Sequence, residues 1–195
     1  MKDLGSQLIK CSILSTRSQA SGQTIVLIGQ FKNHLHRFDL TNCYLRSDNE
    51  FRTQKLKQFC DEDDIAQEFT FPGHSYQNGA AENDNDWLVR KVQKLLFEAA
   101  LTRRFWSLAL QHAVFLYNSR SSAYERFHRK EYNFHPDKLV PFGSRVFIRN
   151  NNNIKKINKS LKASIFLGYD NTIKIIHFLN CNLANRKVVI LRLKV

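Results

Sequence analysis

Residues 45–85 read LRSDNEFRTQKLKQFCDEDDIAQEFTFPGHSYQNGAAENDN. The pattern predicts that Asp48 follows a short strand, because apolar residues are succeeded there by turn-forming ones. It also predicts that Glu82 lies in the first turn of a long helix, because an Asn-Gly pair precedes a run of helix-forming residues. Proteins usually hold divalent metal ions with carboxylates fixed at the ends of rigid elements. The two carboxylates are therefore candidates for a metal site.

Each carboxylate also has an ordinary structural interpretation. An aspartate after a strand often belongs to the turn, and a glutamate in the first turn of a helix stabilises the helix dipole. Taken singly, the structural interpretation is the more frequent one for both residues. Asp48 and Glu82 indicate a metal site only in combination with the motifs around them.

Several segments occur in an order typical of one family. LRSDN-EF is followed by a helical stretch ending in QFC, then by TFP and YQNGAAEN; further on come RRFWSLALQHAVFLYN (103–118), PFGSRVF (141–147) and KSLKASIFLGYD (159–170). Together they resemble the integrase core of copia-type (Ty/copia, Pseudoviridae) LTR-retrotransposon Pol polyproteins, with a yeast Ty element as a suggested origin. The resemblance covers residues 31–195. It implies an α/β fold with an incomplete ribonuclease-H-like, retroviral integrase-type core, and an ancestry in DNA strand transfer.

The resemblance implies a catalytic triad of two aspartates and one glutamate that binds Mg²⁺ or Mn²⁺. The family has thirty-five residues between the second aspartate and the glutamate, whereas thirty-three separate Asp48 from Glu82. Two glycines of the family pattern are missing, since Asn49 is followed directly by Glu50. Asp48 and Glu82 thus match the catalytic and metal-binding pair in vestigial form. Because glycine allows dihedrals closed to other residues, the loss is expected to shift Asp48.

Two further departures concern the site. Residues 1–28 contain no segment resembling the strand that carries the family's first aspartate, and neither Asp3 nor Asp39 is a convincing substitute. In AENDND, an arginine of the family pattern is replaced by Asn83, and aspartates are added that should repel phosphates. We therefore expect an inactive pseudoenzyme without strand transfer, and the chain either keeps Mg²⁺ or Mn²⁺ or has no cofactor.

Positive charge is concentrated near the C-terminal end of the sequence. The net charge is +13, and residues 141–195 hold eleven Lys or Arg against the single acid Asp170. Residues 1–122, in contrast, carry fifteen basic and thirteen acidic side chains. Such a distribution is typical of phosphate contact, although a solvated basic surface explains it as well. The candidate nucleic-acid-binding residues are Lys91, Lys94, Lys155, Lys156, Lys159 and Lys162; for Lys91 and Lys94 a solvated helix face is equally consistent.

The hydrophobic pattern predicts four segments. They are an N-terminal segment (1–28) with a strand at 24–28, a partial integrase catalytic core (29–122), a linker (123–140) and a small basic β-rich module (141–195). Within them we expect helices at 29–39, 51–60, 80–100 and 102–118, and strands at 41–46, 65–71, 144–149, 163–168, 173–179 and 187–193.

The cysteines and the hydropathy indicate the compartment. Cys11, Cys43, Cys60 and Cys181 show no paired metal spacing, so we expect reduced thiols. No apolar run approaches the roughly 18 residues of a membrane span. These features favour an intracellular protein, nuclear or cytoplasmic, without a membrane partner.

Three hypotheses about function follow. The first is a remnant of a retrotransposon integrase whose partners are retrotransposon ends and target DNA, and which forms oligomers if the resemblance extends that far. The second is a non-catalytic nucleic-acid-binding protein that acts through the basic C-terminal module. The third is a decayed reading frame without a maintained function.

Overall fold

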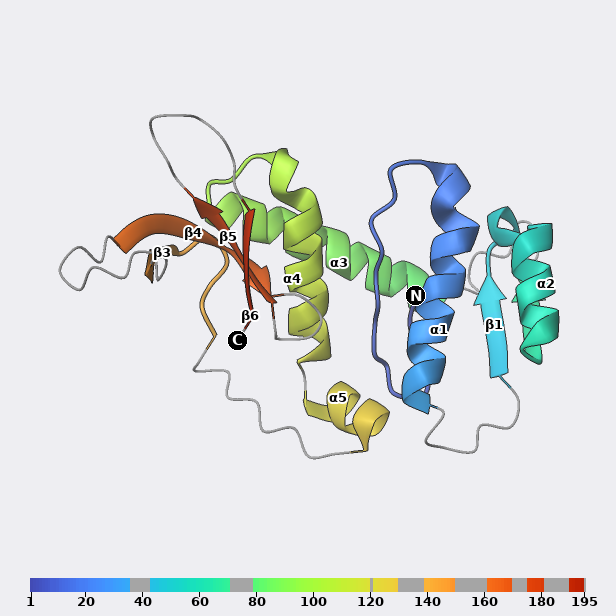
Figure 1. Ribbon diagram of the computed structural model, residues 1–195. Coiled ribbons are helices and arrows are strands. Elements are labelled where there is room, and N and C mark those ends of the chain that lie inside the picture. Colours follow the sequence, from blue (N-terminus) through green and yellow to red (C-terminus); the bar gives the residue numbers. More distant parts are fainter. Residues whose placement is uncertain are drawn as a thin grey trace. The chain divides into compact units, whose positions relative to one another are not determined.

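A computed structural model of the chain contains two compact units, which mix helices and strands (Figure 1). It describes residues 1–35, 43–70, 79–119, 121–129, 139–149, 161–169, 175–180 and 190–194. One unit comprises Met1–Asp86 and Ser122–Lys130, and the other comprises Trp87–Ser121 and Glu131–Val195. The expected α/β class is confirmed at this level. The division into four segments stays a prediction.

The first unit is built on a parallel β-α-β arrangement. Strands β1 (Cys43–Ser47) and β2 (Ile65–Phe69) pair in parallel, and helix α2 (Gln54–Glu62) connects them. The short 3₁₀ turn η2 (Asn49–Phe51) precedes α2. Parallel strands need such a crossover connection, and the predicted strands and helix are thereby confirmed.

Side chains alternate between the two faces of this strand pair, and one of these faces packs against the helices. The apolar core on that face consists of Ile28 from α1 (Ala20–Leu35), Leu56 and Cys60 from α2, and Ile65 from β2. The opposite face is open to solvent and carries a cross-strand ion pair of Arg46 with Glu68, at 2.8 Å.

The strand predicted at 24–28 is wrong, because these residues lie within α1. The run of β-branched residues favours a strand by propensity alone. In the structure, however, Ile25 and Ile28 stand one helical turn apart and both pack against the core of α2. Tertiary packing therefore overrides the local preference.

The predicted linker 123–140 begins as a helix. Helix α5 (Ser121–His128) buries Ala123 and Phe127. The ring of Phe127 meets Phe31 of α1 edge-on, with centroids 5.8 Å apart, and both rings form a small core with Leu8. Residues 130–138 of the predicted linker lie outside the described residues.

Long helices begin the second unit. Helix α3 (Gly79–Glu98) starts in the first unit and continues into the second, and α4 (Trp106–Asn118) follows the 3₁₀ turn η4 (Arg103–Phe105). Both helices were expected. No helix in the described part of the chain combines the length and the apolar character needed to cross a membrane.

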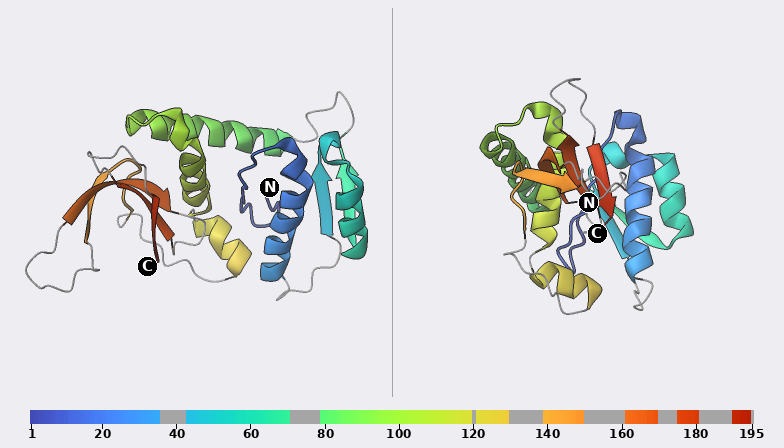
Figure 2. Two further views of the ribbon diagram at one scale, coloured as in Figure 1. Left: turned by 45° about the horizontal axis from the view of Figure 1, so that its top comes forward. Right: turned by 60° about the vertical axis from the view of Figure 1, so that its left-hand side comes forward.

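Four antiparallel strands complete the second unit. They are β3 (Arg145–Arg149), β4 (Leu161–Tyr169), β5 (Ile175–Asn180) and β6 (Ile190–Lys194), adjacent in chain order. Figure 2 shows the curvature of this sheet, whose β4–β5 register shifts between Phe166 and Tyr169. All four predicted strands are confirmed. Since α4 packs on β4, the β-rich segment shares a unit with α4.

An aromatic cluster around His112 of α4 is the centre of this unit. His112 is 2 % exposed, and its ring centroid lies 5.5 to 6.1 Å from those of Phe115, Phe142, Phe166 and Tyr169. The Tyr169 backbone N–H donates to His112 Nδ1 at 3.4 Å. The segments 103–118, 141–147 and 159–170, which carried the family resemblance, therefore meet in one core.

Candidate functional site

Asp48 stands directly after β1, at the carboxyl end of the parallel strand pair. Its side chain is exposed, and the hydroxyl of Thr70, which directly follows β2, donates to Asp48 Oδ1 at 3.4 Å. The Thr70 N–H also donates to the Ser47 carbonyl at 3.2 Å. Ligand sites of open α/β sheets form outside the carboxyl ends of the strands. The fold thus places Asp48 at the edge of the strand pair where ligand sites form in such sheets.

The turn after Asp48 closes without the missing glycines. The Phe51 N–H donates to the Asp48 carbonyl at 3.0 Å, and the Asn49 side-chain amide donates to the Thr70 carbonyl at 3.0 Å. No residue between 48 and 53 has a positive φ. A 3₁₀ turn of ordinary dihedrals therefore follows the strand, so this turn does not depend on the conformational freedom of glycine.

Glu82 lies in the first turn of α3 and is exposed. Its charge is favourable there, because the N-terminal end of a helix is partially positive. Asp84, two residues further on, forms an ion pair with Lys2 at 2.7 Å, and these side chains are only 17 % and 14 % exposed. The charge of Asp84 is therefore largely offset by Lys2, so it contributes less repulsion toward phosphates than the sequence suggested.

Asp48 and Glu82 are the described carboxylates that match the predicted metal-binding pair. Among the described residues, no group of three or more His, Cys, Asp or Glu side chains is placed to hold a metal ion. Residues 71–78, which connect β2 to α3, lie outside the described part. Asp48 and Glu82 belong to the same unit, but they are two donors where a pair of hard cations needs several carboxylate oxygens.

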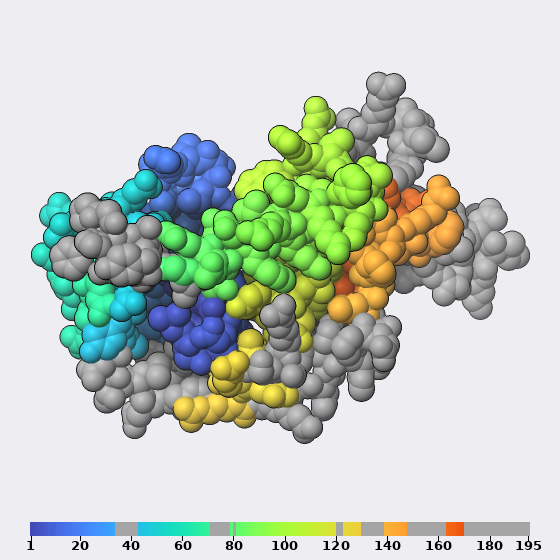
Figure 3. Space-filling model, turned by 180° about the vertical axis from the view of Figure 1, so that it is seen from behind, coloured from blue at the N-terminus to red at the C-terminus, as the bar shows by residue number. Residues whose placement is uncertain are grey.

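Three of the candidate basic residues lie in the described part of the chain, Lys91 and Lys94 on α3 and Lys162 on β4. Lys94 pairs with Glu98 at 3.6 Å on the exposed face of α3, whereas Lys91 is half-buried. Figure 3 shows the surface of α3 as a green band. Lys162 lies on β4 opposite Ile148 of β3. Lys155, Lys156 and Lys159 fall outside the described residues.

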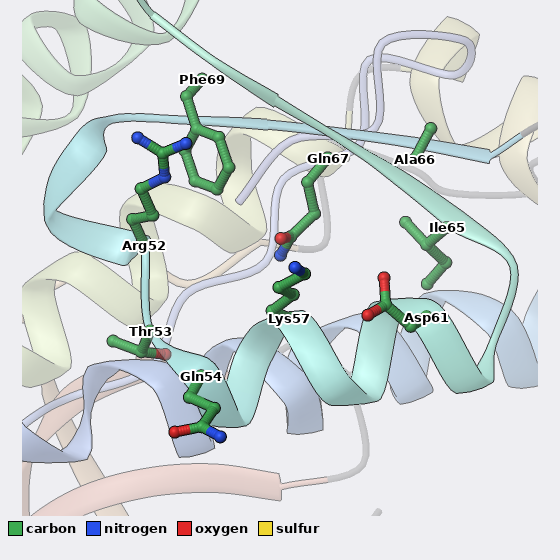
Figure 4. Close-up of a pocket in the computed structure, with 9 residues that line it drawn as sticks. All are labelled: Arg52, Thr53, Gln54, Lys57, Asp61, Ile65, Ala66, Gln67 and Phe69. Atoms are coloured by element: carbon green, nitrogen blue, oxygen red, sulfur yellow. The ribbon is translucent and has the colours of Figure 1, made fainter.

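Sequence reasoning missed a groove between α2 and β2. It encloses about 470 Å³ and is lined by Arg52, Thr53, Gln54, Lys57, Asp61, Ile65, Ala66, Gln67 and Phe69 (Figure 4). Two signals could have indicated it. The charged residues Lys57 and Asp61 are four apart on one helix face, and Ile65, Gln67 and Phe69 alternate along one face of the strand.

No family model matches the chain. Comparison with curated proteins nevertheless shows the class of protein that it resembles: the chain is similar to part of a copia-type retrotransposon Pol polyprotein. The particular relative is the "Retrovirus-related Pol polyprotein from transposon TNT 1-94" of Nicotiana tabacum, to which it is 35 % identical over 136 residues. The match covers 64 % of this chain and 10 % of that polyprotein. The resemblance to a copia-type retrotransposon Pol polyprotein is confirmed, while this plant relative gives no support to a yeast origin.

Proposed function

We propose that this chain is a remnant of an integrase catalytic core with a ribonuclease-H-like fold, and that it does not carry out strand transfer. The observation that supports the ancestry is the position of Asp48 at the carboxyl end of a parallel strand pair, with Glu82 opening the next long helix. These are the two residues that match the family's catalytic motifs. DNA ends and target DNA are the partners that this ancestry suggests.

The loss of activity rests on the donor set. Metal-assisted phosphoryl transfer uses a pair of ions to stabilise the attacking and leaving oxygens. The 195 residues supply two of the three carboxylates that the family resemblance requires, and the described part holds no cluster of three metal-binding side chains. Catalytic groups tolerate displacements of only about 0.5 Å, so two exposed carboxylates do not hold a pair of ions.

Isothermal titration calorimetry of the full chain with Mn²⁺ tests the incomplete donor set. We expect no saturable binding of two ions per chain at low-millimolar concentration, and the same heat for the wild type and for Asp48→Ala. Gln58→Ala, an exposed change on α2, serves as the control for nonspecific effects of substitution. A stoichiometry of two that is abolished by Asp48→Ala, with circular dichroism unchanged, would show that the metal centre is complete.

A second candidate function is nucleic-acid binding without catalysis. Residues 141–195 contain eleven basic residues and one acid, and this excess of positive charge favours nucleic-acid binding. Binding of this kind neutralises phosphates and therefore weakens steeply as salt is added. Two substitutions distinguish this binding from residual enzyme activity. Asp48→Ala should leave the binding unchanged, whereas removal of the charges at Lys155 and Lys156 should weaken it.

A further inference from the structure

The outer edge of β2 is unpaired among the described residues. β2 pairs with β1 on one side, and the two strands form a sheet of their own. Because the Thr70 N–H donates to Ser47, and bonding residues alternate along a parallel strand, the backbone groups of Gln67 and Phe69 point away from β1. Their N–H and C=O groups are thus available to a further strand.

The groove between α2 and β2 runs along this edge (Figure 4). The Arg52 guanidinium lies over the Phe69 ring, 5.2 Å from its centroid, at one end of the groove. Lys57 lies beside Gln67 in the middle, and Asp61 lies near Ile65 at the other end. The side chains that line the groove and the backbone groups that face outward therefore come from the same residues of β2.

Neither Arg52 nor Lys57 forms an ion pair with another described residue. Ion pairs among the described residues join Lys2 with Asp84, Lys32 with Asp63, Arg46 with Glu68, and Lys94 with Glu98. Asp61 is exposed and gives the opposite end a negative charge. The groove is cationic toward Phe69 and anionic toward Ile65.

We propose that the edge of β2 and this groove bind an extended peptide segment by strand addition, with an acidic side chain of the peptide beside Arg52 and Lys57 and a basic one beside Asp61. Main-chain hydrogen bonds to Gln67 and Phe69 supply affinity in such a complex, and alternate side chains supply specificity. The charge complementarity fixes which end of the peptide faces which end of the groove. This site is separate from Asp48 and Glu82 and does not depend on the proposed ancestry.

The same features disfavour a nucleic acid as the occupant. Asp61 lines the groove and is followed by three more acids, of which Asp63 is paired with Lys32 at 3.0 Å. A phosphodiester backbone carries one negative charge per nucleotide and is repelled at this end. A peptide presents alternating donors and acceptors that match a strand edge, and it can change its charge from one end to the other.

Fluorescence anisotropy with the full chain tests this proposal. The probe is a labelled peptide of about seven residues that alternates valine with polar residues and has two glutamates at one end and two lysines at the other. We expect saturable binding, weakened about tenfold by Arg52→Glu. Arg103→Glu, at an exposed arginine of η4 outside the groove, is the matched control and should change the affinity by less than about twofold.

A second set of probes separates strand addition from simple charge attraction. N-methylation of the peptide at alternate positions removes the N–H groups along one edge, and one of the two alternate patterns should weaken binding about tenfold while the other does not. The proposal is overturned if both patterns bind equally, if Arg103→Glu weakens binding as much as Arg52→Glu, or if no binding saturates up to about 1 mM peptide. It is also overturned if a single-stranded oligonucleotide displaces the peptide at equal concentration. Circular dichroism confirms that each variant is folded.

Discussion

Replacing Gly143 with alanine should lower the free energy of unfolding of the second unit by about 3 kcal/mol or more. Gly143 has φ +86°, a region that alanine occupies at a cost of about 1–2 kcal/mol. A Cβ built there would lie 2.3 Å from Ala99 Cβ and 2.9 Å from Ala99 Cα. Because the second contact is to backbone, the end of α3 must shift, and overpacking of this kind costs about 1–3 kcal/mol.

Denaturant unfolding followed by tryptophan fluorescence measures this effect, since Trp87 and Trp106 both lie in the second unit. Gly29→Ala is the matched control. Gly29 is helical, lies in the first unit, and a Cβ there would meet nothing within 4 Å, so alanine should leave the unfolding of the second unit unchanged. Loss of less than about 0.5 kcal/mol in Gly143→Ala would contradict the packing described here.

Acidification should destabilise the second unit through His112. Burial among aromatic rings, with a smaller contribution from the positive charge of Lys91, lowers the pKa of His112 from 6.5 to about 4. Between about pH 4 and pH 6.5, His112 is protonated in the unfolded chain and neutral in the folded chain. The stabilisation from a neutral His112 is therefore fully present above pH 6.5 and is lost as the pH falls toward 4. The shift corresponds to about 3 kcal/mol.

The measurement is the free energy of unfolding as a function of pH, followed again by tryptophan fluorescence. Between pH 8 and pH 5, where carboxylates of ordinary pKa stay ionised, the wild type should lose about 2 kcal/mol. His112→Phe removes the titrating group and should flatten this part of the profile, whatever its own stability. His128→Gln, on α5, should leave the slope unchanged. Equal slopes for wild type and His112→Phe would refute the assignment.

The elements with the strongest patterns were predictable from the sequence, and those that depend on distant packing were not. The apolar stripes of α3 and α4 and the alternating strands of the second unit match their predicted positions within a few residues. Helix α1 was partly misread, because the β-branched residues at 24–28 lie in a helix whose Ile25 and Ile28 pack against the core that contains Leu56 and Cys60. Helix α5 is short and polar, and its position depends on Phe127 meeting Phe31.

The positions of Asp48 and Glu82 in the fold were predictable from the sequence, but their surroundings were not. Motif order identified Asp48 and Glu82, and both lie at the ends of elements as expected. The ion pair of Asp84 with Lys2 joins residues far apart in the sequence, which no local pattern reveals. The buried His112 was also missed, because its neighbours Phe142, Phe166 and Tyr169 come from other segments.

A DNA cleavage and strand-transfer assay measures whether this chain has integrase activity. The purified full chain is incubated with duplex oligonucleotides bearing long-terminal-repeat ends, with Mg²⁺ or Mn²⁺, beside Asp48→Ala and Glu82→Ala. We expect no processed ends and no transfer products above the level of either variant. Metal-dependent products that are formed by the wild type and lost in both variants would contradict this expectation and show that this chain is a working integrase core.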